Sequence, residues 1–93
     1  MAIIMYHGRE CPHCHVMMPL VDKLIEQTGI KITKKEVWHS EKNADEMRSH
    51  KKEIAPACGG DLGTPAFFSP KTKKVLCGEC SYSELVEWVM KNK

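Results

Sequence analysis

The chain has 93 residues, of which 14 are basic and 12 are acidic, which gives a formal net charge of +2. This length suits one domain over residues 1–93. The small net charge, with both signs mixed along the chain, excludes a strongly basic surface for nucleic acid or an anionic membrane. No segment approaches the ~18 apolar residues that a membrane-spanning helix requires, so we expect no nucleic-acid or membrane partner.

The N-terminal sequence MAIIMYHGRE lacks the basic region, the long apolar stretch and the small-residue cleavage site of a secretion signal. We therefore expect a cytoplasmic protein that acts as a monomer. Disulfide cross-links are uncommon in that reducing compartment. The five cysteines are accordingly expected to serve catalysis or metal binding rather than to staple the fold.

The first half of the chain predicts a strand, a helix, a strand and a helix. Residues Ala2–Tyr6 form a short apolar run typical of a buried strand, and apolar side chains then recur at helical spacing over Pro12–Thr28. The segment Ile30–Trp38 alternates weakly, as a strand does. Ser40 is a suitable N-cap for a polar helix over Glu41–Ile54.

The second half predicts a loop, a hairpin and a final helix. The breaker-rich sequence of Pro56–Gly63 indicates a loop. Strands are expected over Thr64–Ser69 and Lys74–Cys77, joined by the short turn PKTK. Ser81 with Glu84 three residues later forms a capping box that begins the last helix.

The resulting order is β-α-β-α-β-β-α. Two strands joined by a crossover helix pair in parallel, whereas a short turn joins antiparallel strands. The sequence therefore predicts an α/β fold with a four-stranded mixed sheet and helices on both faces.

The motif CPHC lies where the first strand gives way to the first helix. Cys11 is expected to be the N-cap of that helix, where unpaired N–H groups and the helix dipole stabilise a thiolate by about 0.3–1 kcal/mol. Pro12 suits the first helical position, and a protonated His13 would stabilise the thiolate further. Cys14 lies one turn deeper, within reach of a mixed disulfide formed at Cys11, so geometry makes Cys11 the nucleophile and Cys14 the resolving thiol.

Two other chemistries remain open for this motif. Cys11 and Cys14 followed by His15 also match a c-type haem attachment site, although a buried strand precedes the motif and three further cysteines are present. Alternatively, Cys11 and Cys14 would hold zinc together with Cys77 and Cys80, as in a binding or interaction module.

Four features occur together: CPHC at 11–14, Pro19 in the following helix, Thr64-Pro65 opening the third strand, and Gly78 before the last helix. In this combination the chain resembles the thioredoxin superfamily over nearly its whole length. It is similar to a minimal, glutaredoxin-sized form that lacks the N-terminal strand and helix of full thioredoxins. The resemblance implies a thioredoxin-like fold.

The resemblance also implies roles for residues around the motif. The peptide bond between Thr64 and Pro65 is expected to be cis, and the Thr64 backbone to pair with a bound substrate. Pro12, His13 and Gly78 are expected to border the same substrate groove.

The activity that the resemblance implies is thiol–disulfide exchange, with Cys11 as nucleophile and Cys14 as resolving thiol. The substrate would be a disulfide-containing protein or a small thiol compound. Another reductant, either a reductase or glutathione, would recharge the dithiol, and no cofactor is required.

The sequence departs from the family pattern beside the motif. Glu10 stands where thioredoxins carry Trp, and its negative charge is expected to raise the pKa of Cys11, with Arg9 opposing that effect. Met5 stands where thioredoxins carry a buried aspartate, which leaves the proton acceptor for Cys14 open.

The second CxxC, Cys77 and Cys80, is not explained by the family pattern. Three interpretations remain open: ordinary thiols, a second redox pair that exchanges with the first, and half of a four-cysteine zinc site. Cys58, in the preceding loop, is either an incidental thiol or one that approaches the same groove.

Overall fold

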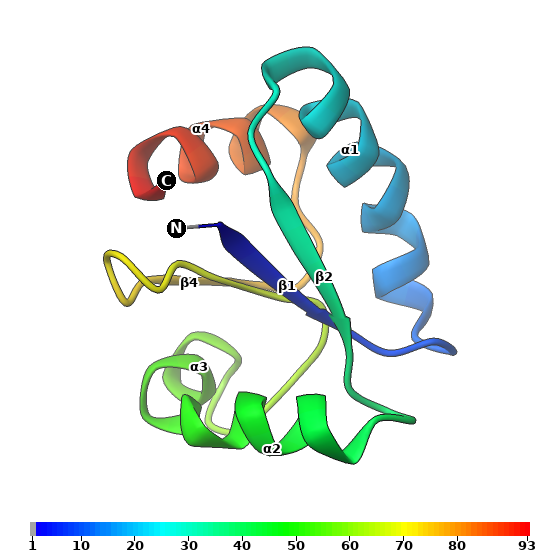
Figure 1. Cartoon of the computed structure of the whole chain (residues 1–93), viewed down its shortest axis with the longest axis vertical. Coiled ribbons are helices and arrows are strands. Elements are labelled where there is room, and N and C mark those ends of the chain that lie inside the picture. Colours follow the sequence, from blue (N-terminus) through cyan, green and yellow to red (C-terminus); the bar gives the residue numbers. More distant parts are fainter. Residues whose placement is uncertain (1) are drawn as a thin grey trace.

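A mixed four-stranded sheet forms the centre of the computed structural model, which describes residues 2–93 (Figure 1). The strands are β1 (Ile3–His7), β2 (Ile32–Glu36), β3 (Ala66–Phe68) and β4 (Val75–Cys77). The helices are α1 (Pro12–Thr28), α2 (Glu41–Ser49), α3 (Lys51–Ala57) and α4 (Tyr82–Asn92).

The sheet has the strand order β2-β1-β3-β4. Strands β1 and β2, which α1 connects, are parallel, while β1 with β3 and β3 with β4 are antiparallel. The predicted α/β architecture with a mixed sheet is therefore confirmed. Within residues 2–93, no helix is long and apolar enough to cross a membrane.

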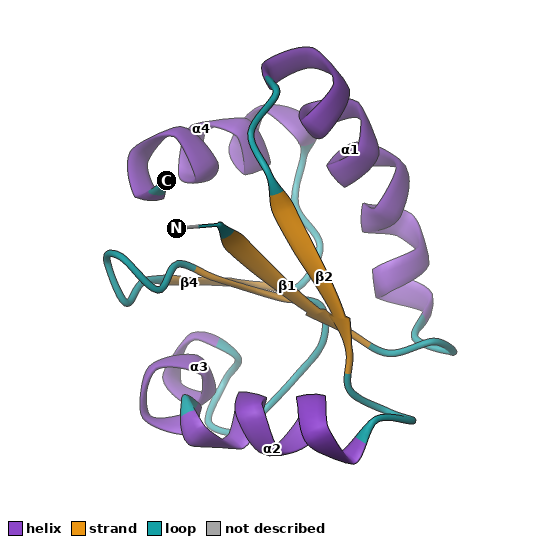
Figure 2. Cartoon of the chain, in the orientation of Figure 1, coloured by secondary structure: helices purple, strands orange, loops and turns teal. Residues whose placement is uncertain are grey.

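Helices cover both faces of the sheet, with α1 and α4 on one side and α2 and α3 on the other (Figure 2). Alternate strand residues point to opposite faces, so Met5 joins the core under α1 and α4 while its neighbour Tyr6 joins the core under α2 and α3. Phe67 and Phe68 divide between the same two cores. Both faces of the central strands are consequently buried, as their apolar sequences predict.

Helix α1 begins and ends where local chemistry dictates. Cys11 has extended backbone angles and accepts the Cys14 N–H as N-cap, and Pro12 occupies the first helical position. Gly29, with φ of 71°, ends the helix in the left-handed conformation that glycine adopts without steric cost. Pro19 lies inside one continuous helix, so the predicted bounds of α1 are confirmed.

The predicted helix over 41–54 is wrong, because two helices occupy this region. His50 leaves the helical conformation, with φ of −107° and ψ of 18°, between α2 and α3. Its ring stacks on Phe68 of the sheet with centroids 4.4 Å apart, a tertiary contact that the local sequence does not encode. Helix α3 then runs through Pro56, where a loop was expected; this proline lies in the last turn, where little of the helix follows it.

The predicted strands are all present, but their ends differ. β1 is displaced by one residue from the expected run, and the other three strands are shorter than expected. β3 begins only at Ala66, because Pro65 before it has no N–H to contribute to a strand ladder. The capping box of Ser81 and Glu84 at the start of α4 is confirmed, with both reciprocal hydrogen bonds formed.

Gly8 connects β1 to the loop that leads to Cys11. Its carbonyl oxygen accepts the Cys11 N–H at 3.1 Å. A Cβ atom at Gly8 would overlap the indole ring of Trp38, which lies directly over the glycine and is 51% exposed. The close approach of the indole therefore requires glycine at this position.

We expect Gly8→Ala to lower the free energy of unfolding by about 1–2 kcal/mol, because the added methyl displaces the indole ring. Urea denaturation measures the loss. Trp38→Ala removes the obstacle, so Gly8→Ala should cost much less in that background. An equal cost in both backgrounds would show that Trp38 is not the reason for the glycine.

Candidate active site

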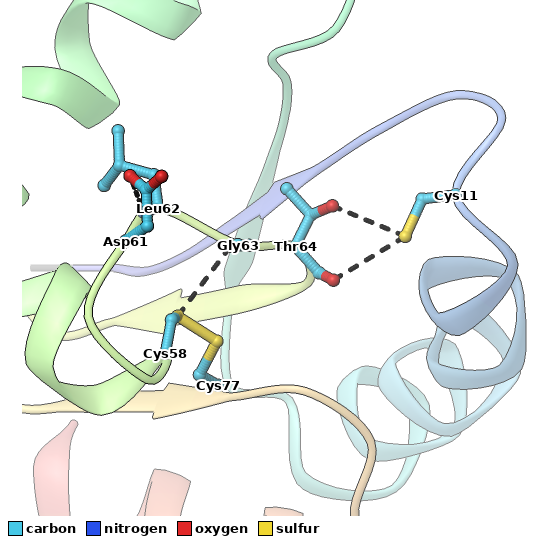
Figure 3. Close-up of a disulfide and its surroundings, with 7 residues drawn as sticks. All are labelled: Cys11, Cys58, Asp61, Leu62, Gly63, Thr64 and Cys77. Carbon is cyan, nitrogen blue, oxygen red and sulfur yellow. Dashed lines mark hydrogen bonds between the residues drawn. A yellow bond between two sulfur atoms is a disulfide. The ribbon is translucent and has the colours of Figure 1, made fainter.

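The Cys11 sulfur lies at the N-terminal end of α1, where two segments distant in sequence meet (Figure 3). The Cys14 N–H donates to Cys11 Sγ at 3.4 Å. From the segment before β3, the Thr64 hydroxyl donates to the same sulfur at 3.4 Å, and the Thr64 carbonyl oxygen lies 3.6 Å away, where it accepts from the protonated thiol. Cys11 is thus held by contacts from both sides and is only 3% exposed.

These contacts favour the thiolate of Cys11. Burial raises the pKa of the thiol, but hydrogen bonds from the Cys14 and Thr64 side chains and from the backbone of Cys14 and His13 outweigh it. The net effect is a pKa below that of an ordinary cysteine. Hydrogen bonds to the charged form account for this direction, as expected at a helix N-terminus.

Cys14 has the opposite character. It is fully buried, and burial together with its hydrogen bond to Cys11 raises its pKa to about 11. At neutral pH Cys14 is therefore a protonated thiol beside a sulfur that ionises readily. The two cysteines of the motif are chemically unequal, although they lie only one turn apart.

His13 lies in the first turn of α1, next to Cys14, and faces the loop between β4 and α4. Its ring forms an ion pair with Glu79, which comes from the loop between β4 and α4. The hydrogen bond to Glu79 and the charge of its carboxylate raise the pKa of His13. No local sequence pattern predicts this pair, because 66 positions separate the two residues.

Glu10 is not among the groups that shift the pKa of Cys11, although its charge was expected to raise it. The Glu10 carboxylate binds the ring of His39 at 2.6 Å, and the pKa of Cys11 is lowered overall. Arg9 contributes its backbone N–H to Glu36 at 2.9 Å. Glu36 is the last residue of β2, the parallel neighbour of β1, and His39 follows it, a placement that only the sheet reveals.

The segment Thr64-Pro65 adopts the expected cis peptide bond. The Pro65 carbonyl oxygen accepts the Gly78 N–H at 2.8 Å, and Gly78 has φ of 85°. The structure thus brings Thr64, Pro65 and Gly78 together, and of the three it is Thr64 that contacts Cys11.

The prediction of a second redox pair between Cys77 and Cys80 is wrong for this structure, because Cys77 forms a disulfide with Cys58. The Cα atoms are 5.4 Å apart across a sequence separation of 19 residues. Cys58 ends α3 and Cys77 ends β4, which places them together at the edge of the sheet. The expectation that no cysteine cross-links the fold is likewise wrong.

Cys80 remains a free, half-buried thiol that packs against the core under α1 and α4. The four-cysteine zinc site is not assembled, because Cys77 is already bonded to Cys58. Within residues 2–93, no group of three or more metal-ligating side chains comes together. The ring of His15, the axial ligand in the haem alternative, instead binds the Arg9 carbonyl oxygen at 2.6 Å.

A groove of about 430 Å³ adjoins Thr64 on the side away from α1. One wall is the loop before β3, and the other consists of α2 and the end of the segment that follows β2. Its lining residues are Val37, Trp38, Ala44, Met47, Arg48, Leu62, Gly63 and Thr64. Of these, only Thr64 was predicted to belong to the site, because the others carry no motif.

The chain matches no model of a known protein family, and no curated protein matches it significantly. The function must therefore be inferred from the chemistry of the site. Its central feature is the unequal pair of cysteines under the hydroxyl of Thr64.

We expect iodoacetamide to label Cys11 faster than Cys14 or Cys80 in the reduced site at neutral pH, since burial raises the pKa of both other thiols. The Cys11 rate should rise with pH with a midpoint below the ~8.5 of an ordinary cysteine, because only the thiolate reacts. Pulsed alkylation with peptide mass mapping measures each rate. Faster labelling of Cys14 would contradict the assignment.

We expect Glu79→Gln to lower the pKa of His13 toward the ordinary value of about 6.5. Because the pair raises the folded-state pKa, its stabilising effect is present below the unfolded pKa and is lost as pH rises through the folded one. An NMR titration of the imidazole measures the pKa. Glu87→Gln, which removes an exposed carboxylate paired with Lys91, is the matched control and should leave His13 unchanged.

Proposed function

We propose that the protein is a thiol–disulfide oxidoreductase of the thioredoxin superfamily. The observation that carries the proposal is the asymmetry of the motif. Cys11 has a lowered pKa and accepts hydrogen bonds at a helix N-terminus, while Cys14 is protonated and fully buried behind it. A nucleophile and a resolving thiol need these two characters.

The reaction begins when the Cys11 thiolate attacks a sulfur of the substrate disulfide. The bond between the substrate sulfurs breaks, a Cys11–substrate disulfide forms, and one substrate thiolate leaves and takes a proton. Cys14 then loses its proton and attacks Cys11 Sγ, so that the second substrate thiolate leaves and a Cys11–Cys14 disulfide remains. Two electrons pass to the substrate, and another thiol reductant then supplies two electrons that return the Cys11–Cys14 disulfide to the dithiol.

The high pKa of Cys14 is compatible with its attack. Burial raises this pKa first, but the hydrogen bond and the negative charge of Cys11 raise it too. Once Cys11 is in a mixed disulfide, its sulfur carries no charge, so the contribution from that charge is removed. The resolving thiol therefore ionises more readily after the first step than before it.

The surroundings of Cys11 support an extended substrate chain. Thr64 contacts the sulfur, Gly78 is hydrogen-bonded to the neighbouring Pro65, and the groove beside Thr64 offers apolar walls to a disulfide-containing protein or a small thiol compound. A reductase or glutathione is the proposed source of electrons for recycling. The two sulfurs hold the exchanged electrons, so the proposed chemistry requires no cofactor.

Membership of the thioredoxin superfamily is supported by four features in one α/β domain. These are the strand and helix order, the CPHC motif at the start of α1, the cis peptide bond at Thr64-Pro65, and Gly78 bonded to Pro65. The motif alone would be weak support, because CxxC also occurs in metal sites.

We expect Cys11→Ser to abolish reduction of a disulfide-bonded model protein such as insulin, because the attacking sulfur is lost. Cys14→Ser should instead accumulate a mixed disulfide at Cys11, visible by mass spectrometry. Cys80→Ser is the matched control and should retain turnover, since that thiol is outside the motif. Retained turnover in Cys11→Ser would refute the proposed function.

A further inference from the structure

We propose that the Cys58–Cys77 disulfide is a positioning element that holds Thr64 against the Cys11 sulfur, so that opening it weakens the reactivity of Cys11 at neutral pH. The consequence for turnover rests on the proposed function. The effect on Cys11 itself does not, because it concerns only the contacts of this sulfur.

The loop before β3 has few other attachments. Within residues 2–93, no backbone hydrogen bond joins residues 61–64 to a strand, a helix or another loop. Gly59 and Gly60 at its start have φ of 87° and 113° and leave open space around them. A segment without a hydrogen-bonded ladder depends on its ends and on packing for its position. The disulfide fixes one end, since Cys58 is the residue at which α3 stops.

The disulfide also packs directly against the residue before Thr64. A Cβ atom built on Gly63 would lie 3.5 Å from Cys58 Cβ and 3.8 Å from both sulfurs, at ordinary contact distance. Cys58 Sγ lies 3.9 Å from the Gly63 carbonyl oxygen. Figure 3 shows the disulfide on one side of the Gly63–Thr64 segment and Cys11 on the other.

The other half of the disulfide, Cys77, supports the residue that follows Thr64. Cys77 is followed by Gly78, whose N–H donates to the Pro65 carbonyl oxygen at 2.8 Å. The disulfide therefore supports Gly63 by contact and Pro65 through this hydrogen bond. Thr64 lies between these two supported residues, with its hydroxyl and its carbonyl oxygen both directed at Cys11 Sγ.

Opening the bond would release both supports together. A dithiol reductant exchanges with the disulfide, so that Cys58 and Cys77 become thiols while the two thiols of the reductant become a disulfide. The two sulfurs then separate to non-bonded distance, and the loop loses its covalent tie to β4. The Thr64 hydroxyl is the atom whose position matters most, because it donates a hydrogen bond to the charged form of Cys11.

A double-mutant cycle tests this coupling. The variants are Cys58→Ala with Cys77→Ala, Thr64→Val, and the combination, each compared with the wild-type chain with its Cys11–Cys14 pair reduced. The measurement is the pH profile of Cys11 alkylation by peptide mass mapping, which requires no turnover. Cys80→Ala is the matched control, since it removes a cysteine that is not bonded to another.

We expect loss of the disulfide to move the midpoint of the Cys11 profile to higher pH and to slow its labelling at neutral pH by about threefold to tenfold, tenfold corresponding to one pKa unit. In the Thr64→Val background the same loss should change the rate by less than about twofold, because the coupled hydroxyl is already absent. An unchanged profile without the disulfide would overturn the proposal. Equal shifts in both backgrounds would also overturn it, because the effect would then not pass through Thr64.

A second measurement avoids any dependence on how the double variant folds. The Cys14→Ser chain is equilibrated in buffers of reduced and oxidised dithiothreitol, and the open fraction of Cys58–Cys77 and the Cys11 labelling rate are measured in the same sample. The rate should fall as the open fraction rises, and a constant rate would reject the coupling. Failure of insulin reduction with intact coupling would reject only the proposed function.

Discussion

The antiparallel pairing of β1 with β3 is the constraint on which the site depends. In this pair Tyr6, near the end of β1, lies opposite Ala66 at the start of β3. The residues that follow β1 and those that precede β3 therefore emerge at the same edge of the sheet. This register brings Thr64 to Cys11 across 53 positions of sequence, and α1 begins at the same point.

The same arrangement explains why two neighbouring cysteines differ. Cys11, as N-cap, presents its sulfur to donors that the first turn of a helix leaves unpaired. Cys14, one turn later, points into the protein, where burial penalises its charge. The local helix start and the tertiary packing thus act on opposite members of the motif, which creates one readily ionised thiol and one protonated thiol within a single tetrapeptide.

The segment CGEC makes three separate contributions to the site. Cys77 bonds to Cys58, Gly78 donates to the carbonyl oxygen of Pro65, and Glu79 pairs with His13. These contacts reach the loop before β3 and the first turn of α1. Cys77 and Cys80 have the same spacing as Cys11 and Cys14, but they are not bonded to each other in this structure. The segment makes these contacts because it lies at the end of an edge strand.

Local sequence patterns were sufficient to predict much of the secondary structure of this protein. Helical spacing, the N-cap at Cys11 and the stop at Gly29 determine α1, and the hairpin turn and capping box determine the later elements, because each acts over a few neighbouring residues. Other features were decided only by the tertiary structure. These are the break at His50, the Cys58–Cys77 disulfide, the binding of the Glu10 carboxylate to His39 and the pairing of Glu79 with His13. Each depends on which strands are neighbours and in what register, and no short stretch of sequence contains that information. The sequence by itself determined where a cysteine pair begins a helix, and the folded sheet decided which distant residues surround it.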